Sequence, residues 1–75
     1  MIKYANVVQR WHLSMQTNPE WRKGQALMNA INEVDKKLYK SIVTDYPDCD
    51  CFYNDDWIHD TLVYVAKYYN EVEGV

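Results

Sequence analysis

The sequence predicts an all-α fold, a compact three-helix domain with a long central helix and an acidic loop before the last helix. Apolar residues recur every three or four positions in three segments, which is the spacing of one helix face. The chain of 75 residues has only two Gly and two Pro, the residues that most often interrupt helices. Its apolar content of 48% is too high for a disordered chain, so we expect residues 1–75 to form a single domain.

The first helix is expected over residues 2–16. Its large apolar side chains follow the helical period and would share one face: Tyr4, Val8, Trp11 and Met15. The opposite face is polar, so one side of this helix should pack against the rest of the domain.

A second, longer helix is predicted from Asn18 to about Val43. Asn18 can cap its first turn with a side-chain oxygen, and Pro19 suits the first helical position because no N–H donor is needed there. The apolar stripe of this segment continues without interruption to Ile42. The period therefore predicts one continuous central helix.

Two residues on that stripe are unusual. Gly24 faces the expected core, although glycine inside a helix costs about 1 kcal/mol relative to Ala. We expect another backbone or an aromatic ring, such as that of Trp11, to lie close to it. Asp35 is a carboxylate on the same stripe and should be paired, either with a Tyr hydroxyl or with Arg10, because a buried polar group needs a partner.

An acidic loop is predicted over residues 44–55. Tyr46 precedes Pro47, which disfavours a continuing helix, and Asn54 or Asp55 can cap the next helix. Cys49, Cys51 and His59 do not have the spacing of zinc ligands, and the aspartates do not follow the order of an EF-hand. We therefore expect no metal and no cofactor.

The last helix is predicted over residues 55–72, with two apolar stripes about 100° apart. One stripe is formed by Ile58, Leu62, Val65, Tyr69 and Val72, and the other by Trp57, Thr61, Tyr64 and Tyr68. This arc is wider than one neighbouring helix covers. The second stripe therefore predicts a partner-binding surface made by Trp57, Tyr64 and Tyr68 together with Tyr46 and Tyr53, since Trp and Tyr are enriched at binding hot spots. The alternative is that these rings fill the core of a very small protein.

Charge is divided unevenly along the chain. Residues 1–40 carry seven Lys or Arg against three acids, whereas residues 41–75 carry one Lys against eight acids. Such asymmetry indicates a partner, self-association or simple attraction within the monomer. The sequence pI of about 5.1 argues against direct nucleic-acid binding.

The acids themselves offer an alternative function. Six aspartates and no cation lie between Asp45 and Asp60. They would imitate nucleic-acid phosphates against a basic groove of a partner, and the residues that carry this alternative are Asp48, Asp50, Asp55 and Asp56. The other interpretation is a solvated loop in which some aspartates cap helices.

Catalysis and membrane insertion find no support in the sequence. There is no nucleophile-elbow or H-E-x-x-H pattern, so we predict that the chain is not an enzyme. No apolar run approaches the roughly 20 residues of a membrane span, and no signal peptide is evident. Cys49 and Cys51 are too close in sequence for a relaxed disulfide, which favours a reducing cytoplasm.

Two segments carry a resemblance to a known group. Residues 21–29 read WRKGQALMN, and residues 51–55 read CFYND. Together they resemble small proteins encoded by tailed phages and prophages, whose pattern is R-x-G-Q-A-x-x-N, then an acidic loop ending in F-Y-x-D, then an amphipathic helix. The resemblance covers roughly residues 17–65. The matching residues are Arg22, Gly24, Gln25, Asn29, Phe52, Tyr53 and Asp55, and Cys51 stands where many relatives have proline.

The resemblance implies an origin rather than an activity. It implies a non-enzymatic phage accessory protein in the cytoplasm of the host cell, acting by protein–protein interaction as an inhibitor of a host factor or of a defence system, in an anti-CRISPR-like role. We expect the chain to form a homodimer. Gln25 and Asn29 are expected to bind backbone carbonyls of Phe52 and Tyr53, and the alternative is a polar pocket for a partner chain.

Overall fold

The computed structural model describes the backbone of residues 3–73 and the side chains of residues 3–70. Within this part the chain forms four α-helices, two short 3-10 helices and no strand. In chain order these are α1 (Lys3–Thr17), α2 (Lys23–Val34), α3 (Lys36–Asp45), η1 (Pro47–Cys49), η2 (Asp55–Trp57) and α4 (Ile58–Glu73). The all-α prediction is confirmed. The prediction of three helices with one long central helix is wrong.

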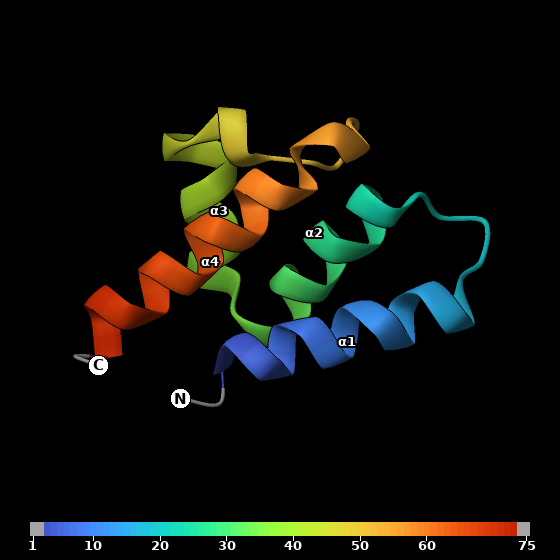
Figure 1. The fold of residues 1–75 in the computed structure, drawn as a ribbon, viewed down its shortest axis with the longest axis horizontal. Helices are drawn as coiled ribbons and strands as arrows, with labels where there is room; N and C mark the ends of the chain where they lie inside the picture. The colour runs from blue at the N-terminus through green and yellow to red at the C-terminus, as the bar shows by residue number, and fades with distance from the viewer. Residues whose placement is uncertain (1–2, 74–75) are drawn as a thin grey trace.

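The helices pack around a common centre (Figure 1). Helix α1 lies along one edge and runs beside α2, α3 turns away behind α4, and the segment with η1 and η2 lies at the top of the view. The start of α1 and the end of α4 lie on the same side of the molecule. All four helices contribute to one cluster of buried side chains, formed by Val7, Leu27, Met28, Ile31, Leu38, Ile42, Cys51, Val65 and Tyr69.

The expected central helix is broken at Asp35. This residue is extended, with φ −153° and ψ 98°, and its carboxylate accepts hydrogen bonds from the backbone N–H groups of Lys37 and Leu38. Aspartate favours this capping position over a helix interior because its short side chain reaches the free N–H groups of the next turn. The hydrophobic period continues across the break, since both α2 and α3 bury their apolar sides in the same core. Periodicity alone therefore does not reveal it.

The start of α2 also differs from the prediction. Asn18 directly follows the last residue of α1, and its backbone N–H donates to the Ser14 carbonyl of that helix at 2.9 Å. A turn follows, and α2 begins at Lys23. Arg22 occupies its N-cap position, but the guanidinium has only donors and does not cap the free N–H groups of this helix. Asn18 and Pro19 therefore do not initiate α2. The Trp11 indole N–H donates to the Lys23 carbonyl at 3.0 Å and joins α1 to this new helix start.

Helix α4 buries the first of its two predicted stripes. Val65 and Tyr69 are fully buried, and Ile58 and Leu62 are partly buried against the core. Val72, the last member of that stripe, has its side chain outside the described residues. In the second stripe Thr61 is buried, whereas Tyr64 and Tyr68 are half-buried and Trp57 is exposed. The last helix therefore keeps part of its aromatic arc open to solvent.

Candidate protein-binding surface

The loop before α4 is held against the first turn of α2 at Gly24. A Cβ atom added there would lie 2.0 Å from the Cys51 carbonyl oxygen and 2.9 Å from an Asp55 carboxylate oxygen. Real Cβ contacts of that length do not occur, so only glycine permits this approach. The prediction that another backbone approaches Gly24 is confirmed. The expectation of an aromatic ring over it is wrong, because Cys51 occupies that place.

Asp55 caps α2 from a distant part of the chain. Its carboxylate accepts a hydrogen bond from the Gly24 backbone N–H at 3.0 Å. This N–H is one of the free donors of the first helical turn, which also carries the positive end of the helix dipole. The Arg22 side chain lies beside the same carboxylate at 3.8 Å and donates to the Phe52 carbonyl. Four of the residues that carry the phage resemblance therefore meet at one contact.

Gln25 and Asn29 do not take part in it. Both side chains are half-buried on α2, and neither makes a side-chain hydrogen bond within the described part of the chain. The prediction that they anchor the loop is wrong, because Arg22 binds the loop carbonyl instead. The long guanidinium reaches across to the carbonyl of Phe52, which no shorter residue of the motif does.

The loop aspartates fall into two groups. Asp50 accepts from the Phe52 backbone N–H at 2.9 Å, and Asp55 caps α2, so both carboxylates are used within the fold. Asn54 caps η2 by accepting from the Asp56 N–H at 3.0 Å, as one of the two predicted caps. Asp48 and Asp56 are exposed and make no hydrogen bond through their carboxylates within residues 3–70.

Part of the predicted aromatic surface forms a continuous group of rings. Tyr46 packs on Tyr64 with ring centroids 4.9 Å apart, and Tyr64 lies 6.2 Å from Tyr68. The Tyr64 hydroxyl shares a hydrogen bond of 2.8 Å with Ser41 of α3, which fixes the ring between the two helices. Tyr46 is 50% exposed, whereas Tyr64 and Tyr68 are half-buried. The rings thus serve both the core and the surface.

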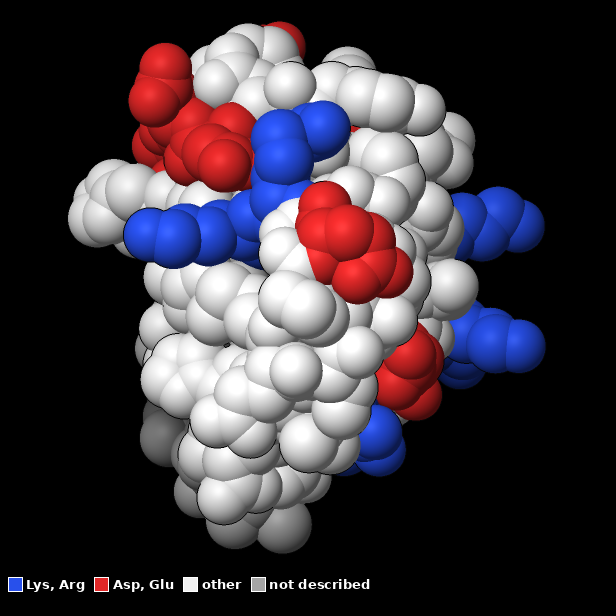
Figure 2. Space-filling model, turned by 90° about the vertical axis from the view of Figure 1, so that its right-hand side faces the viewer, with Lys and Arg blue, Asp and Glu red and all other residues white. Residues whose placement is uncertain are grey.

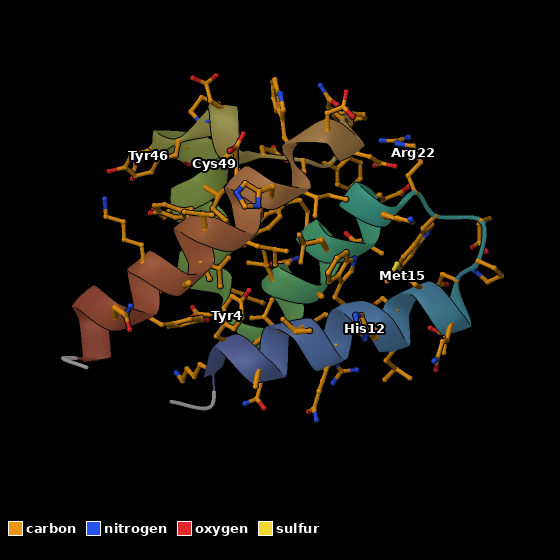
Figure 3. All side chains as sticks on the ribbon, viewed as in Figure 1. Tyr4, His12, Met15, Arg22, Tyr46 and Cys49 are labelled. Carbon is orange, nitrogen blue, oxygen red and sulfur yellow. The ribbon has the colours of Figure 1, made fainter. Side chains whose placement is uncertain are left out.

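A hollow of about 290 Å³ lies beside these rings, between η1 and the first half of α4. Val63 of α4 is 52% exposed there, next to the half-buried Cys49. The complete lining is Asp48, Cys49, Asp60, Val63 and Tyr64. We call these five residues, together with Tyr46, which packs on Tyr64, and Trp57, which lies three residues before Asp60 in the chain, the α4–η1 surface. Figure 3 shows the labelled Tyr46 and Cys49 close together at this end of the molecule.

The walls of the hollow are fixed by a buried hydroxyl. The Thr61 hydroxyl lies within hydrogen-bond reach of the Cys49 carbonyl and also of the Trp57 carbonyl, the latter at 3.0 Å. Thr61 is completely buried, so this contact ties η1 to the first turn of α4. Burial, with help from the negative charges of Asp60 and Asp48, raises the pKa of the Cys49 thiol above its usual 9.0. The floor of the hollow is therefore neutral at physiological pH.

The remaining predicted binding residues lie elsewhere. Tyr53 is 84% exposed and stands near Arg22, with the guanidinium carbon 6.0 Å from its ring centre. Figure 3 shows Arg22 at the opposite end of the loop from Tyr46 and Cys49. Figure 2 shows the side of the molecule that bears the α1–α2 connection, where acidic side chains gather in one corner directly beside basic ones. The predicted aromatic and acidic residues therefore do not form one uniform patch.

Sequence reasoning missed Val63 and Cys49 and placed Asp60 only in the acidic cluster of the alternative function, although all three line the hollow. Helical spacing could have predicted two of them. Asp60 and Val63 follow Trp57 at successive intervals of three residues, so the three positions lie toward one side of the helix. The position of Cys49 depends on the loop path and has no comparable signal.

Of the two partners predicted for the Asp35 carboxylate, a Tyr hydroxyl or Arg10, the structure shows the Tyr hydroxyl. The Tyr69 hydroxyl donates to the carboxylate at 3.1 Å. Arg10 instead forms an exposed ion pair with Glu33 at 3.4 Å. Asp35 therefore joins α3 to α4 as a structural cap and is not a free acid.

No set of three His, Cys, Asp or Glu side chains among the described residues is placed to hold a metal ion. None of the helices in the described part of the chain is both long and apolar enough to cross a membrane. Comparison of the sequence with protein-family models and with curated proteins, and of the fold with solved structures, finds no match. The function therefore has to be argued from the geometry of this chain.

Proposed function

We propose that this chain is a non-enzymatic binding protein that contacts another protein through the α4–η1 surface. The observation that carries the proposal is the exposure of large apolar side chains on a firmly held part of the fold. Tyr46 is 50% exposed, Val63 52% and Trp57 38%. Val63 lines the hollow, Tyr46 packs on the lining residue Tyr64, and Trp57 lies three residues before the lining residue Asp60 in the chain. Aromatic groups on a rigid scaffold lose little conformational entropy on binding, which is why they dominate binding hot spots.

The proposed partner is a protein of a bacterial host. This part of the proposal is supported by the resemblance of Arg22, Gly24, Phe52 and Asp55 to phage accessory proteins. The proposed role is that of an inhibitor of a host factor or of a defence system in the host cytoplasm. The contact made by these four residues holds the loop that forms one wall of the surface. The motif residues would therefore contribute to binding by holding this loop in place.

A homodimer through the same surface is less favoured by its charges. In a two-fold symmetric dimer the same patch faces itself. Asp48 and Asp60 of one copy would then face the same acids of the other, and like charges at an interface disfavour it. Sedimentation equilibrium tests this point, since a stable dimer that Val63→Glu dissociates would show that the partner is a second copy.

The imitation of nucleic acid has weaker support. Asp50 and Asp55 are used inside the fold, which leaves fewer carboxylates to take the place of phosphates. The test is the combined change of Asp48 and Asp56 to Asn. A nucleic-acid mimic should lose its partner in this variant, and duplex DNA should compete with the wild-type chain for that partner.

The proposal itself is tested by capture from bacterial lysate with matched variants. We expect a host protein that the wild-type chain retains and that Trp57→Ala and Tyr46→Ala lose. The control is Leu13→Ala on α1, which removes an apolar side chain that is 46% exposed on a different helix. A captured protein that binds the Trp57 and Tyr46 variants as well as the wild type would contradict the proposed surface.

A further inference from the structure

The hollow of the α4–η1 surface combines an apolar floor with two acidic walls. Val63 and the neutral thiol of Cys49 offer no charge, and the Tyr64 hydroxyl is already bonded to Ser41. Asp48 comes from η1 and Asp60 from α4, so the two carboxylates approach the hollow from different elements. We propose that this hollow takes one apolar side chain of a partner helix that carries Lys or Arg one turn before and one turn after it. This inference rests on the proposed function and names the chemistry of the partner.

The openness of the hollow favours a side chain over a free small molecule. Ligand pockets bury most of the ligand's surface, whereas this hollow of about 290 Å³ opens widely to solvent. An aliphatic side chain placed against Val63 removes apolar surface of both partners from water. An aliphatic side chain needs no hydrogen bond from the floor of the hollow, and the floor has few free hydrogen-bonding groups.

The charge of the walls favours cations on the partner. Neither Asp48 nor Asp60 forms an ion pair with a cation of the described chain, whose ion pairs are Arg10–Glu33 and Arg22–Asp55. The segment between Asp45 and Asp60 also contains no Lys or Arg. Both carboxylates are exposed and therefore free to meet cations on either side of an inserted apolar group. Such charges set partner choice and the rate of association more than affinity.

The elements around the hollow favour a helix as the occupant. The residues of the described chain form no strand, so an extended peptide finds no sheet edge to extend there. Recognition then proceeds through side chains, as when an amphipathic helix lies in a groove and presents residues three or four positions apart. An apolar anchor with a cation one turn away on each side would bring one cation toward η1, which carries Asp48, and the other toward α4, which carries Asp60.

The exposed apolar side chains on the helices of the described chain do not offer this pattern, and Val7, which lies between Lys3 and Arg10, is fully buried. Leu13 is exposed on α1 with Arg10 one turn before it, and Val43 is exposed on α3 with Lys40 one turn before it. Neither is followed by a cation one turn later, and Arg10 is already paired with Glu33. Contacts of this head-to-tail kind between copies also do not close into a dimer. A different protein is therefore the proposed occupant.

The test is selection from a library of helical peptides of about 15 residues, the length at which isolated helices become stable, on the immobilised full-length chain. We expect enriched peptides with an apolar residue flanked by Lys or Arg three or four positions away on both sides. Val63→Glu should weaken the best peptide at least tenfold, and Asp48→Asn and Asp60→Asn should each weaken it about two- to fivefold, the range of exposed ion pairs. Each of these substitutions is at an exposed position, and circular dichroism verifies that the fold is kept.

The matched controls are Leu13→Glu for the apolar change and Glu20→Gln for the loss of an acid, both exposed and away from the hollow, and both should leave the Kd unchanged. Peptides without cations that lose binding in Trp57→Ala but not in Asp48→Asn or Asp60→Asn would overturn the inference while leaving the proposed function standing. The absence of any enriched peptide would overturn the inference as well. The lysate experiment above decides the proposed function separately.

Discussion

Replacing Gly24 with Ala tests how the loop is held against α2. In an exposed helix this change is stabilising by about 1 kcal/mol, because alanine has the better helix propensity. Here the new methyl group would lie 2.0 Å from the Cys51 carbonyl oxygen, whereas ordinary contacts begin near 3.4 Å. The loop must therefore move away from the helix by more than 1 Å, as the difference between these two distances shows.

The size of the effect follows from what that movement breaks. Overpacking alone costs about 1–3 kcal/mol. The hydrogen bond from the Gly24 N–H to the Asp55 carboxylate is charge-assisted, and its loss adds about 1.5–3 kcal/mol. After subtracting the gain in propensity, we expect a net loss of about 1.5–5 kcal/mol. A domain of this length has about 4–11 kcal/mol in total at the usual stability per residue, so the variant should be close to the limit of folding.

The assay is thermal and urea unfolding followed by circular dichroism. At about 4–8 °C per kcal/mol for a small domain, Tm should fall by at least about 6 °C. The control is Asn32→Ala, an exposed position of the same helix, where only propensity changes and Tm should rise slightly. A Gly24→Ala variant that melts at or above the wild-type temperature would refute the close contact between Gly24 and Cys51.

Three further predictions follow from single contacts. Asp35→Ala should lower the free energy of unfolding in urea by about 1–3 kcal/mol, because it removes the α3 cap and a hydrogen bond to Tyr69. In a double-mutant cycle with Tyr69→Phe the two losses should not add, and full additivity would contradict the contact between the two side chains. Asp55→Ala should cost about 1.5–3 kcal/mol because it removes the charge-assisted hydrogen bond that caps α2, whereas Asp55→Asn should cost less because an amide oxygen still accepts from the Gly24 N–H. Equal losses would show that the ion pair with Arg22 matters more than the cap. Burial raises the pKa of the Cys51 thiol above its usual 9.0, so the unfolded chain releases this proton at lower pH than the folded chain does. The urea concentration at the unfolding midpoint should therefore fall as pH rises past about 9. Cys51→Ala should show a shallower fall, and identical pH profiles of the two proteins would contradict the raised pKa.

Much of the fold follows from the sequence because periodicity reports which side of a helix is buried. The last helix shows this well, since Val65 and Tyr69 of its first stripe are in the core. Periodicity does not report whether a helix is continuous. Asp35 lies on the apolar stripe, and its need for a partner is met by a break that turns it into a cap, which only the packing of α3 on α4 decides.

The candidate surface was predictable only in its aromatic half. Tyr46, Tyr64 and Trp57 could be inferred from composition and spacing, because large rings on a second stripe exceed what one neighbour covers. The hollow itself depends on where η1 lies against α4, and this is set by the buried Thr61 hydroxyl near the Cys49 carbonyl. A long-range contact of this kind leaves no periodic trace in the sequence.

The most direct test of the central claim is an NMR titration of the labelled full-length chain with the peptide that binds it best. The two methyl groups of Val63 and the indole N–H of Trp57 report on the α4–η1 surface, and the methyl groups of Leu13 report on the exposed side of α1. We expect large shifts at Val63 and Trp57 and none at Leu13. Shifts confined to Leu13, or to the region of Arg22 and Tyr53, would contradict it.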